Sequence, residues 1–297
     1  GHAGGYNNRM HLLLLNTTHA RKMAKAIPAA PPLASRADRH LLYELAVQCP
    51  EAEVDFIERS FLELRGRKAL ILREDFCGTA AVSCTWVRRD RRHQAVGIDL
   101  DTEVLQWGTT HHVARLKPAQ ARRLALLNQD VMTAGGGQVD AIAAMNFSYW
   151  LFKQRSQLKR YFSRARKALV ADGILFVDAY GGYESFREIE EQREVAADGL
   201  EFTYIWEQEQ FNPVDNGLRC SIHFAFSDGS RIERAFHYDW RLWTLPEIRE
   251  LLLECGFSRV TTYWQGFDEE GEADGEFKPV TEADADAGWI CYLAAEK

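Results

Sequence analysis

From residue 69 onward, short apolar runs alternate with stretches in which apolar residues recur at helical spacing. The apolar runs predict five strands, at 69–74, 94–99, 123–129, 139–145 and 174–178. The helical spacing between them predicts helices at 80–88, 101–112 and 157–169. Strands that alternate with helices in this way are typical of a parallel sheet with helices on both faces. The pattern therefore predicts an α/β fold.

Two helices are predicted before the first strand. Asp38 is a suitable N-cap for a helix that Pro50 ends, and apolar spacing indicates a second helix over 51–64. Residues 1–37 contain prolines at 28, 31 and 32, which interrupt any long helix. We therefore expect residues 1–37 to be a flexible N-terminal arm, with a short helix at 20–25.

The second half of the chain has a different pattern. Three alternating, aromatic-rich runs at 202–210, 218–226 and 231–240 predict antiparallel strands joined by short turns. Thr244 then begins a helix with a capping-box sequence, and that helix ends at Gly256. Strands at 258–264 and 289–294 are expected to close the sheet. The acidic segment 268–286 between them is expected to be a long exposed loop.

Charge is distributed unevenly along the chain. Residues 1–170 contain 26 Lys and Arg against 15 Asp and Glu, whereas residues 171–297 contain 10 against 28. Such polarity is compatible with a nucleic-acid face, an electrostatically paired homodimer or two solvated surfaces, and the last reading is favoured. The six cysteines form no Cys-x-x-Cys pair, which predicts free thiols in a reducing, cytoplasmic setting and no structural metal site. No apolar run approaches 18 residues, so no membrane span is expected.

One stretch carries the clearest chemistry. Residues 70–80 read as a buried strand, a tight Cys77-Gly78-Thr79 turn and a helix, an arrangement that holds a nucleotide-like ligand against backbone N–H groups. Asp99 ends the next strand, 25 residues after Glu74, where a ribose diol would need acceptors. Cys77 lies in the turn, where a cysteine can act as a nucleophile. A buried, unreactive thiol is the favoured interpretation.

These motifs, taken in order, resemble those of class I S-adenosylmethionine-dependent methyltransferases. Glu74 to Ala80 is similar to the family's acidic, glycine-rich first motif, although Phe76 and Ala80 replace its outer glycines. Asp99 matches the ribose-binding acid, and the segment 128–131 resembles the adenine-binding motif through Asp130. Leu169-x-x-x-Gly173 and Leu251-x-x-x-x-Gly256-Phe257 are similar to later family segments. The resemblance covers about residues 38–297.

The resemblance implies a Rossmann-like, mostly parallel sheet with an antiparallel closing strand, and S-adenosylmethionine as the cofactor. Residues 38–180 and 241–297 would form the cofactor-binding core, and 181–240 an antiparallel insertion that covers the substrate as a lid. Arg73 and Tyr43 are expected to meet the amino-acid end of the cofactor. The full set of cofactor-binding candidates is Tyr43, Arg73, Glu74, Phe76, Cys77, Gly78, Thr79, Asp99, Leu100, Asp130, Val131, Asn146 and Phe147.

The methyl acceptor is harder to predict. Asn146-Phe147-Ser148-Tyr149 lies where amino-methyltransferases of nucleic acid and protein carry Asn/Asp-Pro-Pro-Tyr/Phe, but both prolines are absent. The aromatic insertion instead favours a small molecule whose oxygen, nitrogen or carbon is methylated. The candidate substrate contacts are Tyr149, Trp150, Tyr183 and Trp206, and the candidate catalytic groups are His223, His237 and Tyr180.

Three other functions are compatible with parts of the sequence. A hydride-transfer enzyme would need the outer glycines to make room for a pyrophosphate, and Phe76 and Ala80 fill those places. An RNA methyltransferase is suggested only by the basic first half, and no RNA-binding module is present in the sequence. A non-catalytic partner subunit with the same fold stays open.

Overall fold

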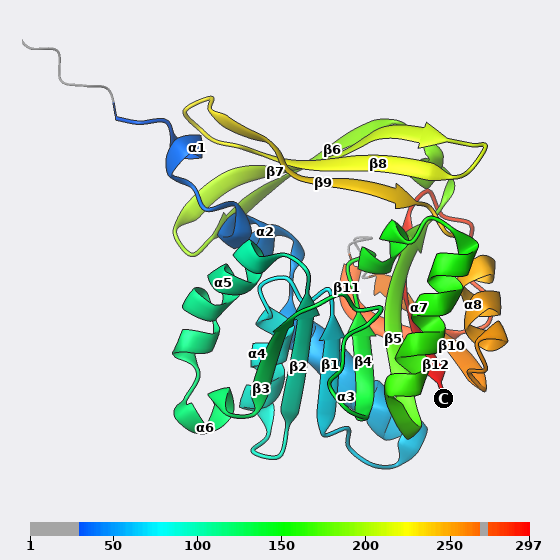
Figure 1. The fold of residues 1–297 in the computed structure, drawn as a ribbon. Coiled ribbons are helices and arrows are strands. Elements are labelled where there is room, and N and C mark those ends of the chain that lie inside the picture. The colour runs from blue at the N-terminus through cyan, green and yellow to red at the C-terminus, as the bar shows by residue number, and fades with distance from the viewer. Residues whose placement is uncertain (1–29, 268–272) are drawn as a thin grey trace, which may run out of the picture. The chain divides into compact units, whose positions relative to one another are not determined.

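A computed structural model describes residues 30–267 and 273–297, and from Pro32 onward they cluster into a single unit. Its larger sheet has eight strands (Figure 1). In spatial order they are β11 (Ala273–Val280), β10 (Arg259–Phe267), β12 (Trp289–Glu296), β5 (Leu169–Gly181), β4 (Val139–Ala144), β1 (Ile71–Asp75), β2 (Gln94–Asp99) and β3 (Leu124–Asn128). Strands β3, β2, β1, β4 and β5 are parallel, and β12 pairs antiparallel with β5.

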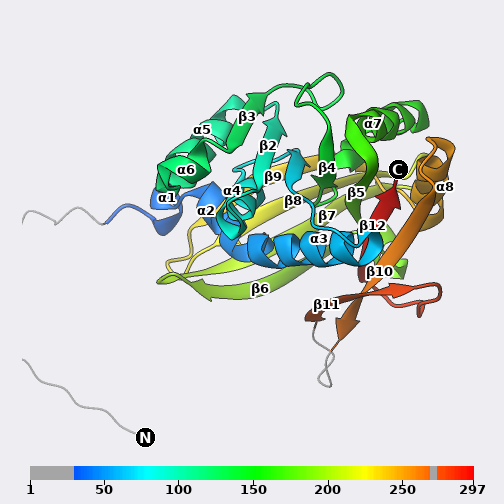
Figure 2. The same cartoon turned by 90° about the horizontal axis from the view of Figure 1, so that it is seen from below.

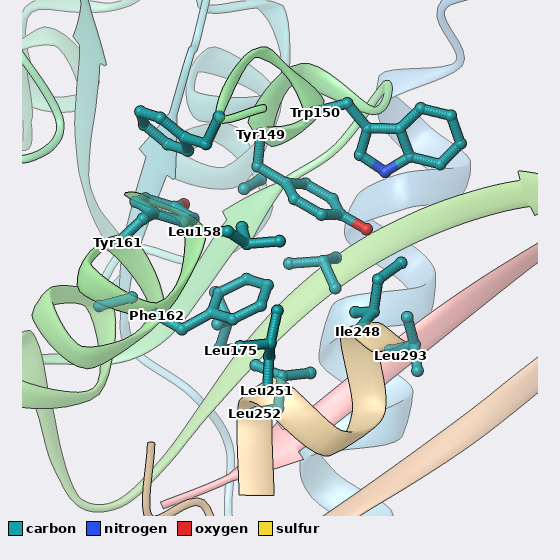
Figure 3. Close-up of a cluster of buried hydrophobic side chains, with 14 of the residues drawn as sticks. Tyr149, Trp150, Leu158, Tyr161, Phe162, Leu175, Ile248, Leu251, Leu252 and Leu293 are labelled. Carbon is teal, nitrogen blue, oxygen red and sulfur yellow. The ribbon is translucent and has the colours of Figure 1, made fainter. Parts of the chain in front are cut away.

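Several helices cover the two faces of this sheet, because each of these presents an apolar stripe to it. The helices of the described residues are α1 (Leu33–Arg36), α2 (Arg39–Val47), α3 (Pro50–Arg65), α4 (Ala81–Arg89), α5 (Thr102–His111), α6 (Pro118–Ala121), α7 (Arg155–Ala168) and α8 (Leu245–Glu254). Helices α3 and α4 pack on one face, and α7 and α8 pack on the other (Figure 2). Figure 3 shows the second of these cores, where Tyr161 and Phe162 of α7 meet Leu251 and Leu252 of α8.

The second sheet is antiparallel and has four strands, β6 (Ile189–Ala197), β7 (Leu200–Asn212), β8 (Gly217–Ala225) and β9 (Arg231–Arg241). Helix α2 packs against it through Leu42 and Ala46, which share a core with Phe202, Ile222 and Phe224 (Figure 1). Residues 38–180, which include α2, were expected to belong to the cofactor-binding core. In the structure, α2 also contributes to the core of the second sheet.

The predicted α/β fold is confirmed, with differences in detail. The insertion has a fourth strand, β6, that the sequence did not predict, because its run Ile-Glu-Glu-Gln-Arg-Glu is almost wholly charged. Strand β11 forms within the segment that was expected to be a loop. Both strands lie at a sheet edge, where polar side chains are tolerated on both faces. Strand β5 begins at Leu169, so Asp172-Gly173 lies inside it beside a register shift.

The arm can be compared with the structure only near its end. The short helix expected at 20–25 lies outside the described residues. Residues 33–36 form the short helix α1, which the sequence did not predict. The N–H of Leu33 donates to Asp228 Oδ2 at 2.8 Å, and that of Ala34 donates to Ser230 Oγ at 3.0 Å. This end of the arm is therefore attached to the second sheet.

Candidate functional site

The loop after β1 has the backbone of a glycine-rich turn although it contains one glycine. Phe76, Gly78 and Ala80 have φ angles of 57°, 51° and 59°, all in the left-handed region. Such a conformation costs a residue other than glycine roughly 1–2 kcal/mol. Phe76 and Ala80 thus occupy positions at which glycine would be unstrained. Both residues nevertheless adopt the turn conformation. Cys77 N–H donates to Ile98 O at 2.9 Å, which holds the turn against β2.

Asp99, at the end of β2, faces this loop as predicted. Its Oδ2 accepts from the N–H of Gly78 at 2.8 Å, and its Oδ1 accepts from the N–H of Asp101 at 2.9 Å. A carboxylate has about four acceptor sites, so both oxygens retain capacity for the hydroxyls of a ligand. The neighbouring Leu100 is 67% exposed.

Arg73 does not lie where the sequence prediction placed it. Its side chain is buried, its Nε donates to Asp75 Oδ1 at 2.6 Å, and its Nη2 donates to Val131 O at 3.1 Å. Tyr161 O–H donates to the other oxygen of Asp75 at 2.8 Å. The guanidinium is thus committed to an internal ion pair and to the loop after β3. Residues two apart on a strand share a face, so the Arg-x-Asp spacing in the sequence could have indicated this ion pair.

The loop after β3 contains Asp130, whose Oδ1 accepts from the N–H of Met132 at 2.8 Å. This turn fixes the carboxylate, and Val131 beside it is held through its carbonyl by Arg73. Asp130 is partly exposed and Val131 is buried. Their neighbourhood at the end of β3 is the one that the sequence predicted.

Glu74 and Cys77 have structural roles in this conformation. Glu74 Oε2 accepts from the N–H and the O–H of Ser83, at 2.9 and 2.5 Å, and so caps the first turn of α4. Burial raises the pKa of Glu74 to about 7. Burial, with the nearby charge of Glu74, also raises the pKa of the Cys77 thiol well above its usual value. A protonated, buried thiol is inert, as the sequence reading favoured.

Glu44 of α2 is a site residue that sequence reasoning missed. Its Oε1 accepts from Thr79 Oγ1 at 2.5 Å and lies 2.6 Å from His112 Nε2. Thr79 belongs to the loop after β1 and His112 follows α5, so one carboxylate connects α2 to both. The partners lie 35 and 68 positions away along the chain, and no local pattern identifies them.

Asn146 and Phe147, after β4, also adopt the left-handed conformation, with φ of 58° and 57°. Asp178 of β5 holds them in it, because its Oδ2 accepts from Asn146 N–H at 2.6 Å and its Oδ1 from Phe147 N–H at 2.9 Å. Burial raises the pKa of Asp178 to about 7. Two adjacent strained residues fixed by one buried carboxylate are typical of a functional loop. Asp178 was not among the sequence candidates.

A cavity of about 470 Å³ opens beside this loop and is lined from both sheets. Asn146, Phe147 and Tyr180 line it from the large sheet, and Tyr43 lines it from α2. From the second sheet, strands β7 and β9 line the cavity with side chains that include Trp206 and Tyr238. This volume is within the usual range for small-molecule sites, about 300–1,000 Å³.

The structure separates the predicted substrate and catalytic residues. Tyr180 and Trp206 line the cavity. Tyr149 and Trp150 are completely buried in the core (Figure 3), and Tyr149 O–H donates to Asp178 O at 2.7 Å. Tyr183 is 63% exposed and does not line the cavity. Tyr149, Trp150 and Tyr183 are therefore corrected from substrate contacts to core and surface residues.

The two histidines lie on the opposite face of the second sheet from the cavity. His223 Nδ1 lies 2.6 Å from Glu233 Oε2, and its Nε2 lies 3.0 Å from Glu207 Oε2. His237 Nδ1 lies 3.0 Å from Ser221 Oγ. Neither lines the cavity, so neither serves there as a base. Within residues 30–267 and 273–297, no cluster of His, Cys, Asp and Glu could hold a metal ion.

A buried acid near the site gives a testable pH dependence. Burial, and then the charges of Glu74 and Asp178, raise the pKa of Glu53 in α3 from an ordinary 4.5 to about 8. The folded state therefore keeps a proton that the unfolded chain releases between these values. Its contribution to the free energy of unfolding should fall by up to about 1.4 kcal/mol per unit of rising pH in this window.

We expect Glu53→Gln to flatten the decline of the free energy of unfolding between pH 6 and pH 8, as measured by urea denaturation. Glu51→Gln, an exposed change in the same helix turn, should keep the wild-type slope. If the pH slopes of Glu53→Gln and the wild type are equal, Glu53 does not hold a proton in the folded state.

The arrangement has counterparts among solved structures. The chain is similar to an S-adenosylmethionine-dependent methyltransferase from Clostridium acetobutylicum, with 18% sequence identity and a TM-score of 0.62 over 86% of this chain and 96% of that one. It is also similar to SAM-bound CalS10, an amino pentose methyltransferase from Micromonospora echinaspora, at 13% identity and a TM-score of 0.61, covering 86% and 95%.

A third similar structure is the sugar N-methyltransferase KedS8 from Streptoalloteichus sp., at 14% identity and a TM-score of 0.59, covering 97% of this chain and 100% of that one. No protein-family model and no curated protein matches the sequence. The structural similarities confirm the predicted fold, that of class I S-adenosylmethionine-dependent methyltransferases. No helix of the described residues is both long and apolar enough to cross a membrane.

Proposed function

We propose that this protein transfers a methyl group from S-adenosylmethionine to a small molecule bound in the cavity between the two sheets. The observation that carries the proposal is the loop at 76–80, which adopts the left-handed turn and faces Asp99. The fold supports the same function, and similar structures are named as methyltransferases of small sugars. The insertion at 181–240 would then act as the lid over the acceptor.

The residues present fit this cofactor. A Cβ built at Gly78 meets no atom within 4 Å, so space is open beside the turn where a ligand would approach the backbone. Asp99 would accept from the ribose hydroxyls and Asp130 from the adenine amino group. Asn146, Phe147 and Tyr43 would border the methionine end, and Leu100 would lie against the adenosine. Arg73 and Glu74 would support the site from behind.

When bound, the cofactor supplies a methyl group activated by a sulfonium sulfur. The chain's own contribution is then to position the acceptor and to exclude water. Asp178 holds the Asn146–Phe147 segment, which lines the cavity. The aromatic walls around Trp206 remove the acceptor from water.

Calorimetric titration with S-adenosylhomocysteine tests the proposal. The wild type should bind, and Asp99→Asn should bind at least tenfold more weakly, because the amide NH₂ would face the N–H of Gly78 or Asp101. Glu103→Gln, a nearby change in α5, should bind like the wild type. Absence of binding to the wild type would refute the proposed function.

A further inference from the structure

We infer that the methyl acceptor is an amine, bound in the cavity as a cation by aromatic side chains and Glu191. This inference rests on the proposed function and names the substrate class of that same site. It depends on three features of the cavity: its aromatic walls, the sign of its uncommitted charge, and the protonation of its hydroxyl groups.

Aromatic rings surround the cavity on several sides. Phe147 and Tyr180 contact edge to face, with ring centroids 4.8 Å apart. On the second sheet, Tyr238 stacks on Trp240 at 4.4 Å, and Trp206 lies 6.3 Å from Trp240. All five line the cavity. Faces of Trp and Tyr attract organic cations by about 0.5–2 kcal/mol each, depending on how far the cation is removed from water.

The charged side chains of the lining favour the same ligand. Strand β6 supplies Glu191 and Arg193 to the cavity, and Glu184 lies nearby. Arg193 keeps its positive charge, but its guanidinium is held in place, because it donates to Ala46 O and its Cζ lies 5.5 Å from the centroid of the Tyr204 ring. Glu184 pairs with Arg187 at 3.3 Å.

Glu191 differs from these two groups. Among the described residues, its carboxylate forms no hydrogen bond or ion pair with another side chain. It is exposed and lies opposite Trp206 in the strand register, so its charge stands beside the aromatic wall. Of the charged side chains that line the cavity, Glu191 is therefore the one without a partner among the described residues, and its charge is negative.

The groups that could act as bases at the cavity favour a nitrogen over an oxygen as the atom that accepts the methyl group. Burial raises the pKa values of Tyr180 and Tyr238 well above their usual range, and that of Tyr204 to about 12. These phenols stay protonated at neutral pH and do not act as bases. In the described part of the chain, no histidine lines the cavity.

An alcohol is about as weak an acid as water, so its deprotonation would need a stronger base than a carboxylate. An alkylammonium, with an ordinary pKa of about 10.4, releases its proton far more readily. The ammonium first passes a proton to a carboxylate at the cavity or to water, which frees the nitrogen lone pair. That lone pair then forms the new N–C bond, and the S–C bond breaks with its electron pair left on sulfur.

The test compares matched cations and neutral molecules. Binding of 2-phenylethylamine and glucosamine is measured calorimetrically against 2-phenylethanol and glucose, on protein without cofactor, and methyl transfer is then followed with labelled S-adenosylmethionine. We expect each amine to bind at least tenfold more tightly than its neutral counterpart. Only the amines should accept the methyl group.

Two adjacent glutamates supply the matched variants. Glu191 lines the cavity, whereas Glu190 points to the other side of β6 and bonds to Gln192. Glu191→Gln should weaken amine binding by about fivefold or more without affecting the neutral molecules, and Glu190→Gln should change neither. Equal binding of amine and alcohol, no amine binding at millimolar concentration, or equal effects of the two variants would overturn the inference. Binding of S-adenosylhomocysteine would survive that outcome, so the two failures are distinguishable.

Discussion

Replacing Gly108 by alanine should destabilise the protein by about 2–3 kcal/mol and weaken S-adenosylhomocysteine binding at least tenfold. A Cβ built at this glycine of α5 would lie 2.2 Å from Thr79 O and 2.7 Å from Thr79 C. These are backbone atoms of the loop that we propose binds the cofactor, so they cannot move without changing that loop. Thr79 is also held by Glu44, which removes a further route of relaxation.

A loss of stability would be informative, because a glycine-to-alanine substitution within a helix ordinarily stabilises the folded protein by about 1 kcal/mol. Urea denaturation gives the free energy of unfolding, and calorimetry gives the dissociation constant. Gly135→Ala is the control, since a Cβ there meets no atom within 4 Å. A Gly108→Ala protein that is as stable as the wild type and binds as tightly would mean that α5 does not set the position of the loop.

Much of this site follows from local sequence. Strand β2 ends at Asp99 as predicted, and the turn at 76–80 forms despite losing two glycines. It forms because the surrounding contacts, such as the Gly78–Asp99 hydrogen bond, offset the strain at Phe76 and Ala80. Local pattern therefore predicts the elements and the turn at 76–80, whereas side-chain partners require the fold.

Arg73 illustrates the difference. Its position next to the turn suggested a ligand contact, but a strand directs alternate residues to opposite faces, and Arg73 shares its face with Asp75. The same alternation of side chains between the two faces of a strand applies to the strands of the insertion. Trp206 and Tyr238 line the cavity, so the odd-numbered His237 on β9 faces away. The alternation could have excluded this candidate from sequence alone.

Glu44 and Asp178 could not have been found in this way. Each acts on a segment that is more than 30 residues distant, and each is an ordinary acid in its local context. Their roles arise from burial next to backbone or hydroxyl donors that only the tertiary structure brings close. Asp178 ends an apolar run, which marks it as unusual but does not name its partners.

Asp178→Ala should lower the free energy of unfolding by about 3 kcal/mol and reduce methyl transfer more than cofactor binding. The change leaves the N–H groups of Asn146 and Phe147 buried without their acceptor, and each unsatisfied group costs about 1–3 kcal/mol. Both residues are also strained, so the segment is expected to leave the left-handed conformation once the carboxylate is gone. The part of the cavity lining that these two residues form would then be lost.

Two further variants separate this role from general damage to β5. Asp178→Asn keeps the shape but offers one acceptor oxygen for two N–H groups, so its stability and turnover should lie between those of wild type and Asp178→Ala. Asp172→Ala on the same strand removes only an exposed ion pair with Arg67, which contributes about 0–1 kcal/mol. If Asp178→Ala were to reduce cofactor affinity and turnover equally, the carboxylate would support the whole edge of the sheet. A loss confined to turnover would place its effect at the Asn146–Phe147 segment, which lines the cavity proposed for the acceptor.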